Sequence, residues 1–145
     1  MLVRPVQPED RQAWLQMRVA LWPDEDGLEA GIEGYFAAHD PNVVTLLAFD
    51  DEPNPVGFAE VGTRAYAEGC ETSPVAFLEG WYVIPQARGT GAGRALVAAA
   101  EDWARSKGLK EFGSDTWLRN EAGIAAHKAL GFEETERLVC FLKRL

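Results

Sequence analysis

The sequence has few of the residues that metal centres and disulfide frameworks require. It contains only two cysteines, Cys70 and Cys140, and two histidines, His39 and His127. The cysteines form no CxxC pair, and together with the histidines they make no plausible set of metal ligands. We therefore expect no bound metal, and we interpret both cysteines as reduced, structural thiols of a cytoplasmic protein.

Long apolar runs and positive charges are also scarce. Apolar stretches such as 43–49 fall far short of the roughly 20 residues that a membrane-spanning helix needs, and the charged N-terminus contains no signal-peptide core. The 14 Lys and Arg are outnumbered by 23 Asp and Glu, which gives a net charge of −9. This balance argues against binding to duplex nucleic acid and favours cationic partners, although acidity also serves solubility alone.

The chain does have enough apolar material for a core. Of its 145 residues, 47% are apolar and five are Trp, and neither a repeat nor a linker divides the sequence. A chain of this size buries roughly 68–70% of its unfolded surface. We therefore expect residues 1–145 to form a single domain.

The spacing of apolar residues predicts an α+β fold. Apolar, β-branched runs predict strands at 2–4, 43–49, 56–66, 75–84, 110–116 and 137–143. Helical spacing predicts helices at about 8–22, from 24 or 26 to 39, at 91–107 and at 120–130. The turn-rich segment 50–55 joins two of the strands as an antiparallel hairpin. The expected architecture is a mixed, mostly antiparallel central sheet flanked by about four helices.

A glycine-rich turn, RGTGAG at 88–93, joins a predicted strand to a predicted helix. Its alternating glycines let the backbone turn sharply and approach a ligand, and the free N–H groups at the positive end of a helix suit a pyrophosphate. A P-loop would need Gly-Lys-Ser/Thr where Arg94-Ala95 follow Gly93, and the 52 residues after Gly93 (145 − 93) are too few for a Rossmann domain. For the glycines alone, a flexible turn without a ligand is the alternative.

Two motifs together resemble those of the GCN5-related N-acetyltransferase (GNAT) superfamily. The run 82–93, followed by Ala95-Leu96, resembles its acetyl-CoA signature, and Asn120 with Gly131-Phe132 matches its downstream pattern. The order of the predicted elements also matches over essentially the whole chain. The resemblance implies a GNAT-type fold and acetyl-CoA as co-substrate.

The same resemblance implies where the cofactor binds. Pantetheine would pair with the exposed backbone of 81–83, the pyrophosphate would bind the N–H groups of 89–94, and Asn120 would hold the pantetheine side. The implied cofactor-binding residues are Trp81, Tyr82, Val83, Arg88, Gly89, Thr90, Gly91, Ala92, Gly93, Arg94 and Asn120. The superfamily often has a tyrosine seven residues after this Asn, as acid for the leaving thiolate, but here that position is His127. The general acid is therefore either His127 or solvent.

The chemistry implied by the superfamily, attack of an amine on a thioester, directs attention to carboxylates. An alkyl ammonium with a pKa near ~10.4 is only about one part in a thousand neutral at pH 7, and a carboxylate near the amine can accept its proton, directly or through water. Glu79 lies within the strand 75–84 among apolar neighbours, and Asp115 lies near the end of the strand 110–116. The alternatives are an outward-facing strand residue for Glu79 and a turn or helix cap for Asp115.

Further segments resemble the aminoglycoside 6′-N-acetyltransferases. They are 21–23, 69–75, 77–80, 114–116 and 129–137, all outside the general cofactor motif. The resemblance implies aminoglycoside contacts at Trp22 and Tyr66, and an acidic pocket of Glu79, Asp115 and Glu136. Flat aromatic surfaces and spaced carboxylates suit a hydroxylated polycation, although Trp22 can also be read as a core residue that closes the first helix.

These observations lead to one hypothesis and two alternatives. We expect an acetyl-CoA-dependent aminoglycoside 6′-N-acetyltransferase that works by direct transfer in a ternary complex, without an acetyl-cysteine. The alternatives are a GNAT enzyme for polyamine or protein amines and a non-catalytic acyl-CoA sensor. Because related enzymes are commonly dimers, we also expect a homodimer, with the strand at 137–142 as a candidate interface.

Overall fold

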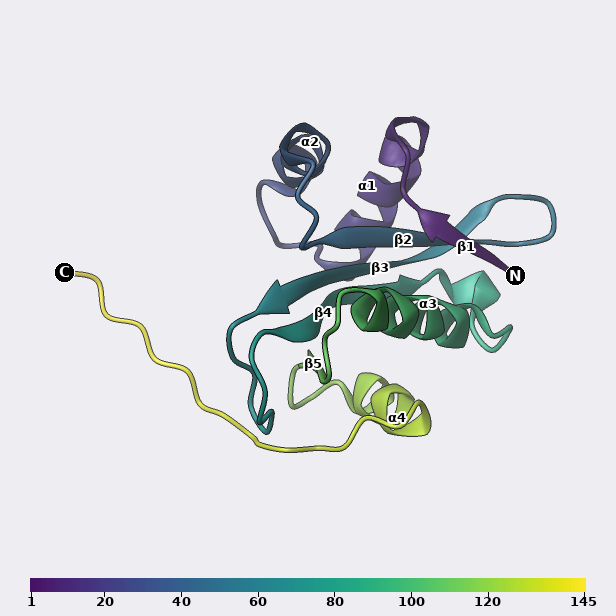
Figure 1. Cartoon of the computed structure of the whole chain (residues 1–145). Helices are drawn as coiled ribbons and strands as arrows, with labels where there is room; N and C mark the ends of the chain where they lie inside the picture. The colour runs from purple at the N-terminus through teal and green to yellow at the C-terminus, as the bar shows by residue number, and fades with distance from the viewer.

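A five-stranded sheet runs through the computed structural model, which describes residues 1–145 (Figure 1). The order of the strands across the sheet is the same as their order along the chain: β1 (Leu2–Pro5), β2 (Val44–Phe49), β3 (Pro55–Arg64), β4 (Val75–Val83) and β5 (Phe112–Ser114). The first four are joined antiparallel, and only the β4–β5 pair is parallel. The prediction of a mixed, mostly antiparallel sheet is confirmed.

Four helices cover the two faces of this sheet. Helices α1 (Arg11–Leu21) and α2 (Leu28–Ala38) lie on one side, and α3 (Ala92–Ser106) and α4 (Glu121–Ala129) lie on the other (Figure 1). Short 3₁₀ turns at Pro8–Asp10 and Pro85–Ala87 lead into α1 and towards α3. The predicted α+β class and the four helices are therefore confirmed. No helix is both long enough and apolar enough to cross a bilayer.

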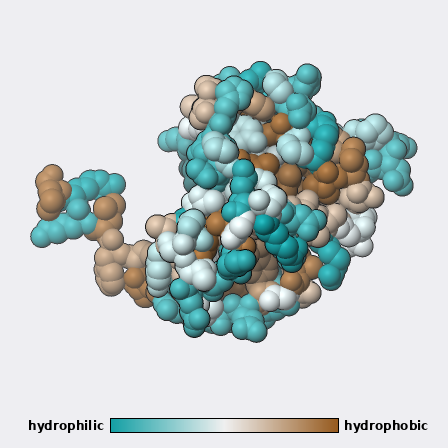
Figure 2. Space-filling view, in the orientation of Figure 1, coloured by the Kyte–Doolittle hydropathy of each residue, from teal (hydrophilic) through white to brown (hydrophobic).

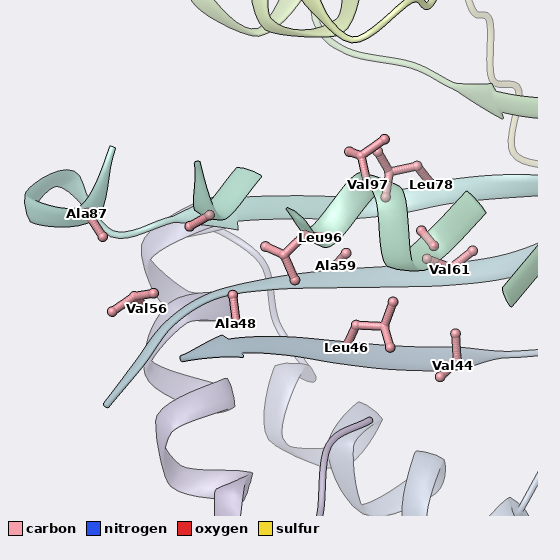
Figure 3. Packing of buried hydrophobic residues seen from close by; sticks show 12 residues of the cluster. Val44, Leu46, Ala48, Val56, Ala59, Val61, Leu78, Ala87, Leu96 and Val97 are labelled. Carbon is pink, nitrogen blue, oxygen red and sulfur yellow. The ribbon is translucent and has the colours of Figure 1, made fainter. Parts of the chain in front are cut away.

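The central strands are buried on both faces because their alternate side chains enter two different cores. On the α3 side, Leu96 and Val97 pack against Ala59, Val61 and Leu78 (Figure 3). On the α1–α2 side, Trp14 of α1 joins Leu47, Phe58 and other apolar side chains. This double burial explains the continuous apolar run of β2, in which every residue is buried.

The prediction of a last strand at 137–143 is wrong for this chain. Residues 133–145 contain no strand; after Thr135, which contacts the β3–β4 loop, the chain runs outward from the body of the protein (Figures 1 and 2). Their large apolar side chains are exposed: Leu138, Val139, Phe141, Leu142 and Leu145. The apolar pattern favours an extended backbone, but a strand also needs a partner for its N–H and C=O groups, and no strand of the same chain pairs with this segment.

Candidate functional site

The turn between β4 and α3 forms a cradle of free backbone donors. Gly89 and Gly91 have φ values of +79° and +96°, a left-handed region that side chains disfavour. The first helical hydrogen bond of α3 runs from the Ala95 N–H to the Gly91 carbonyl at 2.9 Å. The preceding donors bond to no acceptor in the chain, namely the N–H groups of Gly89, Gly91, Ala92, Gly93 and Arg94. The helix dipole makes this cradle a site for an anionic group.

Each glycine of the cradle has its own physical reason. A Cβ on Gly89 or Gly91 would meet no atom within 4 Å, so the need there is for positive φ and for open space above the turn. A Cβ on Gly93 would instead lie 3.1 Å from Cζ2 of Trp81, so Gly93 lets the indole pack closely on α3. The buried Trp81 Nε1 has no hydrogen-bond acceptor in the chain.

Strands β4 and β5 separate on the way to this cradle. They pair only between Ala76–Leu78 and Phe112–Ser114, whereas β4 continues to Val83 with β3 as its only partner. One backbone edge of 79–83 therefore faces no strand, as the superfamily resemblance implied for the pantetheine site. Arg88 Nε donates to the Val83 carbonyl at 3.0 Å and so closes the end of this edge nearest the cradle.

Asn120 immediately precedes α4, and His127 of α4 packs edge-on against Trp81 of the open edge, with ring centroids 5.3 Å apart. Asn120 caps the helix, because its Oδ1 accepts the Gly123 N–H at 3.0 Å and its Nδ2 donates to Thr116 Oγ1 at 2.9 Å. The His127 ring is held at both nitrogens, with Nδ1 2.6 Å from the Gly123 carbonyl and Nε2 2.8 Å from Ser114 Oγ. Since a carbonyl only accepts, Nδ1 carries a proton.

Glu79 lies within β4, as predicted, but it occupies a β-bulge and its side chain is exposed, in agreement with the alternative of an outward-facing strand residue. In the β3–β4 register Glu60 pairs with Gly80 and Val61 pairs with Leu78, which leaves Glu79 as the extra residue. Consequently Leu78 enters the core under α3, while Gly80 faces the opposite helices. A bulge re-aims the side chain at its position, and 41% of the Glu79 side chain is exposed.

Arg64, which sequence reasoning missed, is the ion-pair partner of Glu79. Its Nε and Nη2 donate to Oε1 and Oε2 of Glu79 at 2.8 and 2.7 Å. The pKa of Arg64 is raised above its ordinary value, first by these hydrogen bonds and then by the negative charges of Glu79, Asp115 and Glu68. Asp115 directly follows Ser114, which pairs with Leu78, so the sheet register places Asp115 next to Glu79. The only signal for this ion pair in the sequence is that an arginine ends β3, the strand that pairs with the one containing Glu79.

Trp22 stands beside the bulge. A Cβ on Gly80 would lie 2.6 Å from Cη2 of Trp22, and the indole also packs edge-on against Phe58 with ring centroids 6.2 Å apart. Trp22 is only partly buried. The inner edge of Trp22 therefore packs against the core, as the alternative of a core residue expects. The rest of the indole forms part of the wall next to Glu79.

A groove of about 300 Å³ lies between α1–α2 and the sheet and reaches Glu79. A second carboxylate, Glu60, lines it, but this group accepts hydrogen bonds from Trp14 Nε1 at 2.9 Å and from Arg18 Nε at 2.6 Å. Arg18 also donates to the Leu28 carbonyl at 2.7 Å. Glu60 thus joins α1 to β3 directly, and α2 through Arg18. Glu79 is the more accessible carboxylate of the groove.

The remaining candidates lie on exposed segments around this site. Tyr66 is 64% exposed just after β3, and Glu136 is exposed near the start of the C-terminal tail, residues 133–145. The neighbouring Thr135 Oγ1 donates to the Glu68 carbonyl at 3.2 Å, which places the start of the tail against the β3–β4 loop. No hydrogen bond or ion pair joins Tyr66 or Glu136 to Glu79 or Asp115 within one chain. The structure brings together Trp22, Arg64, Glu79 and Asp115.

Comparisons with known proteins agree with this architecture. Residues 9–132 match the model of the acetyltransferase (GNAT) family. An aminoglycoside N(6′)-acetyltransferase type 1 of Klebsiella aerogenes is 47% identical over 150 residues, which cover 99% of this chain and 97% of that protein. A protein of the same name from Acinetobacter genomosp. 13 is 42% identical, with 100% of this chain and 99% of that protein covered.

Solved structures show the same fold over the full length. The aminoglycoside 6′-N-acetyltransferase AAC(6′)-IG of Acinetobacter haemolyticus has a TM-score of 0.89 at 37% identity, with 100% of this chain and 99% of that chain covered. AAC(6′)-Iy in complex with the bisubstrate analogue CoA-S-monomethyl-acetylneamine has a TM-score of 0.90 at 35% identity, covering 99% and 98%. The match of the family model, the identities over nearly the whole chain and the shared fold lead to one conclusion: the chain belongs to the acetyltransferase (GNAT) family.

Proposed function

We propose that the protein transfers an acetyl group from acetyl-CoA to the 6′-amine of aminoglycosides, in a single acetyltransferase domain formed by residues 1–145. The main observation behind this proposal is that a single strand, β4, connects the cofactor side of the site to the acceptor side. It ends at the cradle of free N–H groups, and its unpaired edge leads back to the bulge that holds Glu79. The relatives named for the same activity support this assignment.

The chain's own residues fit acetyl-CoA. The N–H groups of 89–94 would hold the pyrophosphate, and the unpaired edge of 81–83 would pair with pantetheine. The residues proposed to bind the cofactor are those that the superfamily resemblance implies, including Asn120 at the start of α4. When bound, acetyl-CoA supplies the acetyl thioester. AAC(6′)-Iy, which has the same fold, has been solved with CoA.

The acceptor would bind at the other end of this edge. Trp22 and Tyr66 provide aromatic surface, and Glu79, Asp115 and Glu136 provide negative charge for its ammonium groups. In the proposed mechanism Glu79 or Asp115 takes the proton of the reacting amine, directly or through water. Because both His127 nitrogens are already hydrogen-bonded, we propose that solvent rather than His127 protonates the leaving thiolate.

A covalent relay through Cys70 is disfavoured by the state of its thiol. Burial raises the pKa of the Cys70 thiol, and the charges of Glu111 and Glu68 raise it further. Since the thiolate is the nucleophile, such a cysteine reacts poorly. We expect Cys70→Ala to keep kcat within about twofold of wild type, measured as thiol release with tobramycin. A loss of turnover of a hundredfold or more, with normal folding, would contradict direct transfer.

We further propose a cytoplasmic homodimer in which the C-terminal tail contributes to the interface. The apolar side chains of the tail are exposed in one chain: Val139 by 78% and Phe141 by 92%. An extended segment of this kind suits pairing with a strand edge of a second copy. Light scattering on the full chain tests this proposal, and a monomer at micromolar concentration would contradict it.

The activity is tested by comparing acceptors under identical conditions. We expect kcat/KM for tobramycin or kanamycin to exceed that for spermidine or a lysine-containing peptide. The reverse ranking would favour a GNAT enzyme for polyamine or protein amines. Tight CoA binding without turnover of any amine would favour an acyl-CoA sensor.

A further inference from the structure

Arg64 holds Glu79 in a two-pronged ion pair at the acceptor side of the site. The guanidinium Nε and Nη2 each donate to a different oxygen of the carboxylate, at 2.8 and 2.7 Å. The same guanidinium lies 3.6 Å from the centre of the Phe77 ring. Such paired, charge-assisted bonds use the geometry that carboxylates favour. The carboxylate proposed to receive an ammonium group thus already binds a cation of its own chain.

A second carboxylate of the site, Asp115, is placed beside this ion pair by the sheet. Leu78 pairs with Ser114 in the β4–β5 register, so Glu79 and Asp115 each directly follow a paired residue on neighbouring strands. Besides the hydrogen bonds to Glu79, the negative charges of Asp115 and Glu68 also raise the pKa of Arg64. Glu79 and Asp115 are the groups proposed above to bind the ammonium groups of a polycationic acceptor. Arg64 and the acceptor therefore need the same carboxylates.

We propose that Arg64 is an internal counter-ion of the acceptor site, which the ammonium group of the acceptor displaces from Glu79. This inference rests on the proposed function, because it assumes that an amine binds at Glu79. Arg64 then determines acceptor affinity: every amine competes with a tethered guanidinium. A polycation overcomes this competition because its other ammonium groups bind the neighbouring carboxylates, whereas a monoamine has no such compensation.

The exposure of the pair makes displacement feasible. The Arg64 and Glu79 side chains are each 41% exposed, whereas those of Arg18 and Glu60 are 15% and 14% exposed. Arg18 and Glu60 have further hydrogen-bond partners in the Leu28 carbonyl and Trp14, whereas Arg64 donates hydrogen bonds only to Glu79 and lies over the face of Phe77. Exposed ion pairs stabilise proteins little, so an acceptor can separate Arg64 from Glu79 at small cost.

The test is the steady-state kinetics of Arg64→Gln with tobramycin at saturating acetyl-CoA. Loss of an exposed competing pair is expected to lower KM for tobramycin about three- to fivefold and to leave kcat within about twofold. Arg64→Lys, which keeps the charge without the planar fork, should lie between this variant and wild type. The matched control is Arg105→Gln, which removes exposed ion pairs on α3 away from the site and should leave KM unchanged. Calorimetric titration of the CoA complex with tobramycin should give the same ratio of affinities.

Other outcomes overturn the inference. An unchanged or raised KM in a normally folded Arg64→Gln protein means that Arg64 does not compete with the acceptor. A lowered kcat at constant KM means that Arg64 orients Glu79 instead. If wild type turns over tobramycin but the variant shows no gain in affinity, only this inference fails. If wild type neither binds nor acetylates any aminoglycoside, the proposed function fails as well.

Discussion

Gly91→Ala is expected to lower kcat/KM for acetyl-CoA by about two orders of magnitude. Gly91 has φ of +96° and immediately precedes α3, where it orients the free N–H groups of the cradle. A side chain costs roughly 1–2 kcal/mol in this conformation, and relief of the strain would rotate donors away from the pyrophosphate. Each charge-assisted hydrogen bond contributes about 1.5–3 kcal/mol, so the loss of one or two gives the expected decrease.

A control variant at the other end of α3 separates an effect on CoA binding from an effect on folding stability. Gly108 follows α3 with φ of +74°, and a Cβ there would also meet nothing within 4 Å. We expect Gly108→Ala to lower the melting temperature about as much as Gly91→Ala does, because the backbone strain is similar. Only Gly91→Ala should lose affinity for CoA in calorimetric titration. Equal CoA affinities in the two variants would contradict the placement of the cofactor.

Glu79→Gln and Asp115→Asn are expected to lower kcat for aminoglycosides, one of them by about 10²- to 10³-fold, since proton acceptance by a placed carboxylate contributes roughly 10²–10⁴. The two variants identify the base. Replacement of the carboxylate that takes the proton should give the larger loss in kcat, whereas replacement of the other should mainly raise KM. In the variant that lacks the base, activity should increase steeply with pH, because only amine already neutral in solution can react.

The matched control for this pair is Glu101→Gln on α3, which removes only an exposed pair with Arg105. It should keep wild-type kcat and KM. Wild-type kcat in both Glu79→Gln and Asp115→Asn would remove these carboxylates from the mechanism. Circular dichroism and melting temperatures establish that each variant is folded.

The elements with strong local signals were predictable from the sequence. The run RGTGAG predicts a turn at the start of a helix from glycine geometry alone, and it has the expected positive φ at Gly89 and Gly91. The β2–β3 hairpin follows from two apolar runs joined by a turn-rich segment. In each case the relevant physics acts between residues near in sequence, so the pattern carries the information.

The features that were missed depend on register and on partners far along the chain. A bulge at Glu79 arises from how β4 pairs with β3, and a strand pattern does not reveal that one residue is left over. The ion pair of Glu79 with Arg64 joins residues 15 apart in the sequence. The tail at 137–143 has the apolar content of a strand, but strand formation requires a neighbouring strand, which the residues themselves do not specify.

Transfer of one acetyl group to one amine is the reaction on which the proposed function depends. Purified protein should be incubated with acetyl-CoA and tobramycin, thiol release followed, and the product identified by mass spectrometry and by NMR. We expect stoichiometric CoA release and a single acetyl group on the 6′-nitrogen. No thiol release with any aminoglycoside, or acetylation at a different nitrogen, would contradict the proposed function.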